Sequence, residues 1–191
     1  MLNVISGIFS EGVPPIPPST NSYESIQTYT VGSGGSSSIT FSSIPSTYKH
    51  LQIRAITKTD GAGNGYSMIA SANGNTTTAD YHSHFMLGDG SSASAAAYQV
   101  TGGVYLIGTT TGAGSASQLF SPMVIDILDY ASTNKNKTFR YLAGQDRNGA
   151  GSITFGSGLW INTSAINSLN LSVNGGNLVQ YSSIALYGIK G

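Results

Sequence analysis

Charged residues and cysteine are what this chain most conspicuously lacks. Among its 191 residues, eight are Lys or Arg and eight are Asp or Glu, so the formal net charge is zero, and there is no cysteine. An ordinary soluble domain is about one quarter charged, whereas this chain is 8% charged. The absence of cysteine excludes disulfides, thiolate catalysis and cysteine-ligated zinc. Without a basic cluster, nucleic acid is not an expected partner, because its phosphates require Lys and Arg on one face.

Long apolar runs are also missing. No stretch reaches the ~18–20 uninterrupted apolar residues that cross a membrane as a helix. The apolar start at residues 1–9 has no basic residue before it and leads into Glu11, so we expect neither a signal peptide nor a membrane partner. Glycine is abundant instead, with 25 residues, alongside many Ser, Thr and Asn. A chain of this length is large enough to build one core unaided.

The first 25 residues differ from the rest of the chain. Four of the six prolines lie in one short segment that consists of Pro14, Pro15, Ile16, Pro17 and Pro18. Proline fixes φ and removes a backbone donor, which favours extended chain over helix or central strand. We therefore predict an extended N-terminal arm over residues 1–25 and one folded domain over residues 26–191. The proline segment is interpreted as an anchor against a neighbouring subunit, with an unattached leader as the alternative.

From Ile26 onward, apolar and polar residues alternate with a period of two. Leu51, Ile53 and Ala55 would point to a dry face of one strand. The polar residues expected on its wet face are His50, Gln52, Arg54 and Lys58. By the same criterion, we expect strands near residues 26–31, 37–42, 49–58, 66–70, 81–88, 98–107, 118–130, 137–144, 152–161, 166–173 and 179–189. No segment keeps a helical apolar period over three turns, and residues 91–97, which come closest, are expected to be loop. The sequence thus predicts an all-β fold, an antiparallel β-sandwich or jelly roll.

Turn signals predict how some strands are joined. The Asn-Gly-Gly-Asn segment at residues 174–177 predicts a hairpin between the last two strands. A second hairpin is expected between residues 123–130 and 138–143. Further Asn-Gly pairs at 64–65, 73–74 and 148–149 mark other turns.

Two expected strands are apolar on both faces, over residues 123–130 and 184–189. Such a strand lies between two layers, or between one sheet and a second subunit. Residues 90–125 also carry no charge, which favours an interface or a core-spanning strand pair. A loop region solvated by Ser and Thr explains the same stretch equally well.

Candidate catalytic and metal-binding residues are few. His82 and His84 would share one face of a strand and could reach one ion. Only Asp89 follows nearby as a carboxylate, so a surface or interface histidine pair is favoured over a metal site. Asp126 lies among apolar residues and needs a partner, and Arg140 on the adjoining hairpin strand is expected to supply it. No catalytic residue and no cofactor are therefore expected, although a β-sandwich hydrolase stays open as a minor alternative.

Exposed aromatic side chains surrounded by Asn, Asp and Gln can form a platform for sugars. Trp160 and Tyr105 are the candidates that we single out for such a glycan platform. The alternative is that these rings are core residues, as most sandwich tyrosines are, with a hydrated hydroxyl.

Several segments resemble small structural proteins of tailed bacteriophages, particularly those of aquatic phages. The segments that carry this resemblance are Tyr29–Gly35, Ser38–Ile53, Asp129–Lys137, Gly158–Ile166 and Ser183–Gly191. The resemblance spans residues 26–191 and implies a jelly-roll-like module that occurs as a stand-alone virion protein or at the end of a fibre. It brings no catalytic residues with it.

Resemblance and composition together predict a non-enzymatic virion protein. We expect a homotrimer that decorates or cements the capsid, with the major capsid protein or other virion proteins as partners and the arm as its anchor. Assembly in the reducing cytoplasm of a bacterial host fits the lack of cysteine. The alternative is a tail-fibre or receptor-binding module that recognises host surface glycan.

Overall fold

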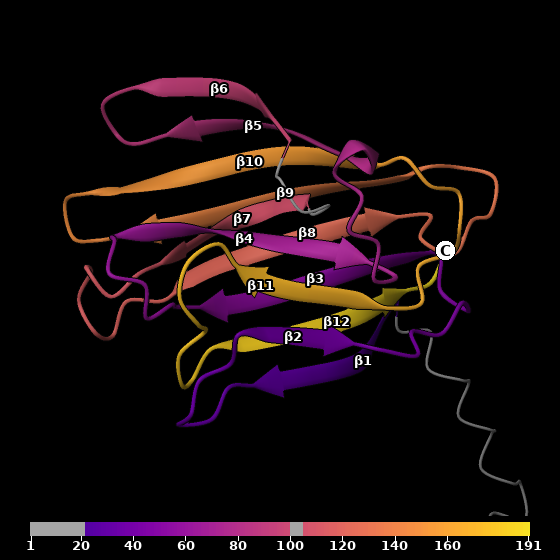
Figure 1. Ribbon diagram of the computed structural model, residues 1–191, viewed down its shortest axis with the longest axis horizontal. Coiled ribbons are helices and arrows are strands. Elements are labelled where there is room, and N and C mark those ends of the chain that lie inside the picture. The colour runs from indigo at the N-terminus through magenta and orange to yellow at the C-terminus, as the bar shows by residue number, and fades with distance from the viewer. Residues whose placement is uncertain (1–21, 100–104) are drawn as a thin grey trace, which may run out of the picture.

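The protein is a two-layered β-sandwich in the computed structural model, which describes residues 22–99 and 105–191, with the side chain of Tyr105 excluded. The described residues form twelve strands in two antiparallel sheets, which confirms the expected β-sandwich (Figure 1). With eight and four strands, the two sheets hold more strands than an eight-stranded jelly roll.

The larger sheet consists, in spatial order, of β1 (Tyr23–Thr30), β12 (Ser183–Ile189), β3 (His50–Thr57), β8 (Ser121–Leu128), β9 (Lys137–Asp146), β10 (Gly151–Trp160), β5 (Tyr81–Gly88) and β6 (Ala93–Tyr98). The smaller sheet consists of β2 (Ser38–Phe41), β11 (Leu169–Val173), β4 (Gly65–Ala72) and β7 (Tyr105–Thr111). A short 3-10 helix, η1 (Thr78–Asp80), precedes β5. In the described part of the chain, no helix is long and apolar enough to cross a membrane.

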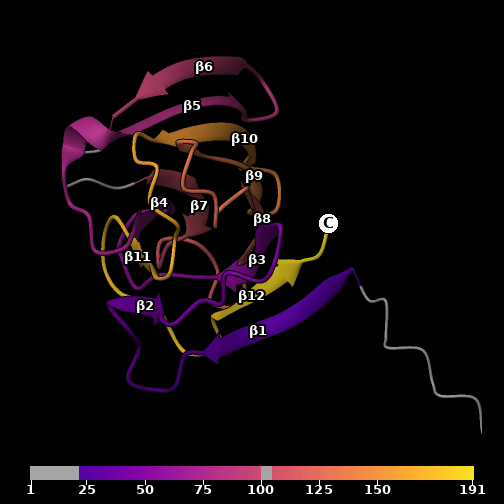
Figure 2. The same cartoon turned by 90° about the vertical axis from the view of Figure 1, so that its right-hand side faces the viewer.

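The smaller sheet covers one face of the larger sheet, as the edge-on view in Figure 2 shows. The β5–β6 hairpin and β1 form the two ends of the larger sheet. Every residue of β6 is exposed. The outer face of the larger sheet is not covered by any other described layer, so the outward side chains of this sheet form the surface there.

The core lies between the sheets and follows the period-two pattern. Leu51 and Ile53 of β3 and Ile125 of β8 point inward and are at most 1% exposed, as the alternation predicts. At one end of the core, Tyr81 stacks on Trp160 with ring centroids 6.2 Å apart. The inner faces of both sheets thus supply the apolar area whose burial stabilises the fold.

Two glycines of β10 make room for aromatic rings of β9. A Cβ built on Gly158 would lie 1.8 Å from the Phe139 ring, and one on Gly156 would lie 2.3 Å from the Tyr141 ring. These residues are direct cross-strand neighbours. Glycine at both positions is therefore required by the close approach of the rings.

Most expected strands are present, but two expectations around residue 98 are wrong. Residues 91–97, expected as loop, contain most of β6, and the single strand expected at 98–107 is divided between β6 and β7. β6 and β7 belong to different sheets. The Ala- and Ser-rich sequence of β6 has no alternation to signal a strand, because both of its faces are exposed.

One of the two expected hairpins is confirmed. β8 pairs with β9, and the Asn148-Gly149 turn joins β9 to β10. The Asn-Gly signal at 174–177 does not form a hairpin, because β11 and β12 lie in different sheets. Leu178 is fully buried just after this turn and bridges Ser36 and Thr59, so its burial directs the chain across the sandwich.

Lys58 does not lie on the wet face expected for it. β3 ends at Thr57, and the next residue turns toward the smaller sheet, where it bridges Thr111. The ammonium group of Lys58 donates hydrogen bonds to the carbonyl oxygens of Gly112 and Ala116, at 3.1 and 3.0 Å. Burial lowers the pKa of this ammonium. Lys58 is thus a buried residue whose hydrogen bonds hold the loop that follows β7.

The expected domain boundary at residue 25 falls inside β1, which begins at Tyr23. Its residues 23–30 pair along β12. The folded domain therefore begins a few residues earlier than the sequence suggests.

Candidate functional site

The outer face of the larger sheet carries a group of exposed apolar side chains. We call this group the apolar face, and it consists of Ile56, Met86, Val124, Leu142, Ile153 and Phe155. They come from five strands that are adjacent in the sheet, namely β3, β8, β9, β10 and β5, of which β8, β9 and β10 are consecutive in sequence.

Strand register aligns these side chains in rows. Val124 lies opposite Leu142, Leu142 opposite Phe155, and Phe155 opposite Met86. Side chains directly opposite each other on antiparallel strands have Cβ atoms about 4.5–5.5 Å apart. The row is therefore continuous across four strands.

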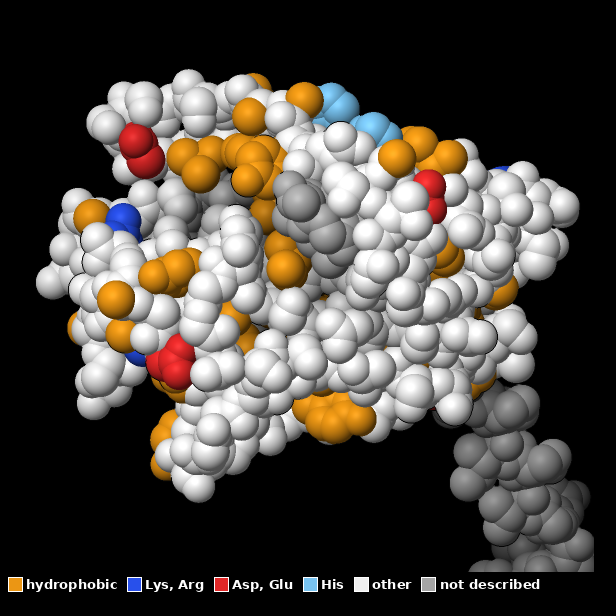
Figure 3. Space-filling view, viewed as in Figure 1, with side chains coloured by type: hydrophobic (Ala, Val, Ile, Leu, Met, Phe, Trp, Pro, Cys, Tyr) orange, Lys and Arg blue, Asp and Glu red, His pale blue; other side chains and the backbone are white. Residues whose placement is uncertain are grey.

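The exposed fractions on the apolar face are large. They run from 40% for Val124 to 61% for Met86. Single exposed apolar residues are common on soluble proteins, whereas a contiguous group marks a surface that meets another molecule. The opposite side of the molecule, which carries the smaller sheet, shows mostly uncharged polar and backbone atoms in Figure 3.

A row of polar groups runs beside the apolar face on the same side of the sheet. Asp126 accepts a hydrogen bond from Arg140 Nε at 3.0 Å and another from Gln52 Nε2 at 2.8 Å. This pairing confirms the ion pair expected between Asp126 and Arg140. Arg54 donates to Gln52 at 2.8 Å, and its guanidinium lies 5.6 Å from the Tyr187 ring centroid. Asp126 is thus held in a structural network and does not face a second carboxylate.

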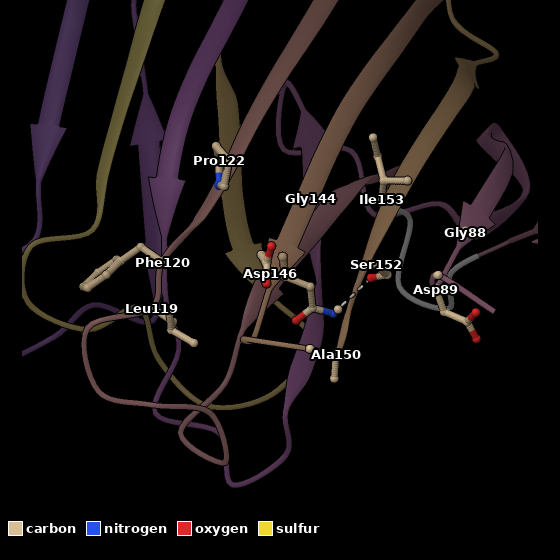
Figure 4. A pocket seen from close by; sticks show the side chains of 14 residues that line it. Gly88, Asp89, Leu119, Phe120, Pro122, Gly144, Asp146, Ala150, Ser152 and Ile153 are labelled. Atoms are coloured by element: carbon tan, nitrogen blue, oxygen red, sulfur yellow. Dashed lines mark hydrogen bonds between the residues drawn. The ribbon is translucent and has the colours of Figure 1, made fainter. Parts of the chain in front are cut away.

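A cleft of about 660 Å³ lies at one end of the larger sheet (Figure 4). The turn between β9 and β10, the turn after β5 and the segment before β8 line it, and they bring Asp89, Phe120, Gln145 and Asp146 to its walls. Gln145 Nε2 donates to Ser152 Oγ at 3.2 Å. Sequence reasoning does not identify this cleft, because its lining comes from three separate turns.

Asp89 is unsuited to act as a general acid in this cleft. Its carboxylate accepts hydrogen bonds from the backbone N–H groups of Ser91 and Ser92 and from both hydroxyls, and these bonds lower its pKa. Acid catalysis of glycoside hydrolysis needs a carboxyl with a raised pKa. Asp89 therefore does not have the raised pKa that a general acid needs.

The histidine pair lies on the outward side of β5. His82 pairs across the sheet with Leu159, and His84 with Ser157. Over residues 22–99 and 105–191, no three His, Cys, Asp or Glu side chains gather in a way that could hold a metal ion.

The expected glycan platform at Trp160 is wrong. Trp160 is 1% exposed and packs against Tyr81 in the core, so its ring cannot stack on a ligand from solvent. β10 ends at this residue, and its alternation turns the indole inward. Tyr105 begins β7 opposite Ala70, and its side chain lies outside what the structure describes.

The proline segment of the arm lies outside the described residues. Its role as an anchor, assigned to Pro14, Pro15, Ile16, Pro17 and Pro18, therefore stays a prediction.

A cluster of charged side chains lies just after the end of β8, around Asp129. Asp129 accepts a hydrogen bond from Lys135 at 2.7 Å and lies 3.0 Å from the ammonium of Lys49. These two lysines, Lys135 first, hold the pKa of Asp129 at about 2. Its backbone N–H also donates to His50 Nδ1 at 3.0 Å. The cluster fixes the loop between β8 and β9.

No family model, curated protein or solved structure matches this chain.

Proposed function

We propose that this chain is a non-enzymatic structural protein of a bacteriophage virion, and specifically a decoration or cement protein of the capsid. The observation that carries the proposal is the apolar face, a contiguous group of six large side chains on a molecule with few charged residues and no formal net charge. Surfaces of this kind are typical of proteins that function within assemblies.

Further support comes from the composition and the sequence resemblance. Permanent contact with neighbours suits a chain of which only 8% of the residues are charged, because few charges need to be desolvated when the contact forms. The segments that resemble phage structural proteins include the loop between β8 and β9 and the whole of β12. The arm and a β-face of the sandwich would bridge neighbouring copies of the major capsid protein, and the added interface would slow their separation.

The proposal is tested by locating the protein in particles. Antibodies raised against the purified chain, used for immunogold labelling of phage propagated in its host, should label heads. The absence of label, together with absence of the protein from mass spectra of purified virions, would contradict the proposal.

The anchoring role of the arm needs its own experiment. Because β1 begins at Tyr23, a deletion of residues 1–21 leaves the sandwich intact. Particles with this variant should show lower occupancy and should release DNA at a lower temperature than wild-type particles. Full occupancy and full heat resistance would show that the arm is not the anchor.

The alternative, a tail-fibre module that binds host glycan, is favoured by one feature, the cleft at the end of β9 and β10. Carboxylate and amide groups near Phe120 suit the hydroxyls and C–H faces of a sugar. Saturable binding to host polysaccharide that Phe120→Ala and Asp146→Asn reduce would support it, as would immunogold label on tail fibres. No binding on a glycan array or to host cells would exclude it.

A further inference from the structure

We infer that the apolar face is covered by a second copy of this chain, so that the two larger sheets pack face to face. The two copies are related by a two-fold axis that lies midway between these sheets, parallel to the strands and centred between β8 and β9. The inference rests on the proposed function only in treating this face as an assembly surface. It adds the identity of the partner and the symmetry of the contact.

The axis is placed between β8 and β9 because this is the centre of the larger sheet and because Asp126 and Arg140 are cross-strand neighbours there. Between β8 and β9 the sheet divides into four strands on each side. Rotation by 180° about this axis reverses the order of the strands across the sheet. It does not shift the cross-strand rows along the strand direction. Each row therefore meets the same row of the second copy, with the strands exchanged about the axis.

The charges on the face complement each other under this rotation. Asp126 of β8 and Arg140 of β9 are direct cross-strand neighbours, so the rotation places each of them over the other residue of the second copy. Arg140 uses Nε for Asp126 of its own chain, and no described residue hydrogen-bonds to its Nη atoms. Its side chain is 62% exposed, and its free Nη groups can donate to the partner's Asp126.

The apolar side chains match in the same way. Val124 and Leu142, which are also cross-strand neighbours on β8 and β9, exchange places across the contact. One strand further out on each side, β10 meets β3, which brings Ile153 over Ile56 of the second copy. At these positions apolar groups face apolar groups, as in the packing of two sheets about 10 Å apart. In the row of Val124, the same rotation places Phe155 of β10 over Arg54 of β3.

The area of the proposed contact, which includes the apolar face and the row of Asp126 and Arg140, reaches the lower end of the range for specific interfaces. With strands about 4.8 Å apart and alternate residues about 7 Å apart, three rows on the six central strands cover about 600 Å² per copy. Two copies would bury about 1,200 Å², within the range of specific protein interfaces. A partner of different sequence could also use apolar contacts, but it would have to reproduce the paired acid and base that a second copy supplies by symmetry.

The first experiment measures the mass of the full-length protein by light scattering and sedimentation across micromolar concentrations. We expect a dimer, and we expect Leu142→Asn to raise its dissociation constant by about tenfold or more. Ile161→Thr is the matched control, because Ile161 is similarly exposed, at 44%, but lies just beyond β10 and outside the apolar face. A dimer that Leu142→Asn does not weaken overturns the inference.

The second experiment tests the symmetry through the charges. Asp126→Arg produces a copy with two bases, and Arg140→Asp produces a copy with two acids, so each variant alone should dissociate. Their equimolar mixture should recover a dimer, because each base then faces an acid of the other copy. If Asp126 and Arg140 interacted only within one chain, mixing the two variants would not restore the dimer. Failure of the mixture to associate would contradict the two-fold arrangement.

The outcomes separate this inference from the proposed function. A monomeric wild-type protein overturns the inference and leaves location in the virion to the immunogold experiment. A trimer overturns the two-fold axis and favours the homotrimer expected from the sequence. Absence of the protein from virions contradicts the proposed function but leaves a measured dimer unaffected.

Discussion

At the scale of single residues, the glycines of β10 bear directly on stability. A methyl group at Gly158 would overlap the Phe139 ring, because the added Cβ would lie 1.8 Å from it. The ring is buried between the sheets and cannot move without disturbing the core.

We therefore predict that Gly158→Ala lowers the free energy of unfolding by about 1–3 kcal/mol. For a chain of this size the melting temperature should fall by roughly 2–4 °C for each kcal/mol. Gly34→Ala is the control, because a Cβ added there would have no atom within 4 Å and the backbone at this position is unstrained. Equal melting temperatures for the two variants would show that the ring adapts at no cost.

Asp129 supplies a prediction about acid stability. Its folded pKa of about 2 lies below the usual value, because Lys135 and Lys49 favour the carboxylate. A depressed carboxyl pKa contributes stability that is complete above the unfolded value of about 3.9 and is lost as the pH falls toward 2. The Nδ1 atom of His50 lies 3.9 Å from the same Asp129 carboxylate.

The denaturant midpoint of wild-type protein should therefore fall between pH 4 and pH 2 more steeply than that of Asp129→Asn. Asparagine suits the positive φ of 47° at this position, so the substitution removes the charge and keeps the turn. Urea titrations at a series of pH values measure both midpoints. Identical pH dependence in the two proteins would mean that the lysines do not stabilise the folded carboxylate.

At the scale of elements, period-two patterning predicts the buried strands well and the exposed strand poorly. The sequence of β3 alternates because one face of the strand packs on the core, whereas β6 has no buried face and its sequence shows no alternation. The Asn-Gly signal is equally local. It predicts the turn between β9 and β10, but it cannot tell that Leu178 is buried on the way to the other sheet.

The candidate site shows the same limit. The sequence reveals that the β8 segment is apolar on both faces, and it supports the Asp126–Arg140 pair through hairpin register. Sequence patterns do not link Met86 and Phe155 to that segment, because their alignment depends on the order of β5 and β10 in the sheet. The expectation for Trp160 is wrong because an indole ring suits both a sugar platform and a core.

β6 is an open sheet edge and supports a prediction of its own. Its residues, Ala93–Tyr98, are uncharged, contain no proline and are all exposed. β1, at the other end of the sheet, has Glu24 and an irregularity between Ser25 and Gln27 that interrupts regular pairing. Unprotected edges pair with other chains, and a lysine on the edge opposes this.

We expect Ala96→Lys to slow heat-induced aggregation several-fold with little change in melting temperature. Ala62→Lys, in an exposed loop, adds the same charge away from the edge and serves as the control. Turbidity and light scattering during a temperature ramp measure the rate. Equal protection by both variants would attribute the effect to net charge and not to the edge of β6.

At the scale of the whole molecule, the scarcity of charge and the composition of the apolar face determine how association should respond to salt. The six residues of the face carry no charge, and the proposed contact between copies adds the exchanged Asp126–Arg140 pairs and the exposed Arg54 of β3. Salt weakens exposed ion pairs by screening, whereas it does not weaken the burial of apolar area.

Raising NaCl from about 0.05 to about 0.5 M should therefore change the dimer dissociation constant by no more than about threefold, while the Debye length falls from about 14 to about 4 Å. Ammonium sulfate should tighten the dimer, because excluded salts strengthen apolar burial. Sedimentation equilibrium at each salt concentration measures both effects. A dissociation constant that rises more than about tenfold with NaCl would mean that charge attraction, and not the burial of the apolar face, holds the copies together.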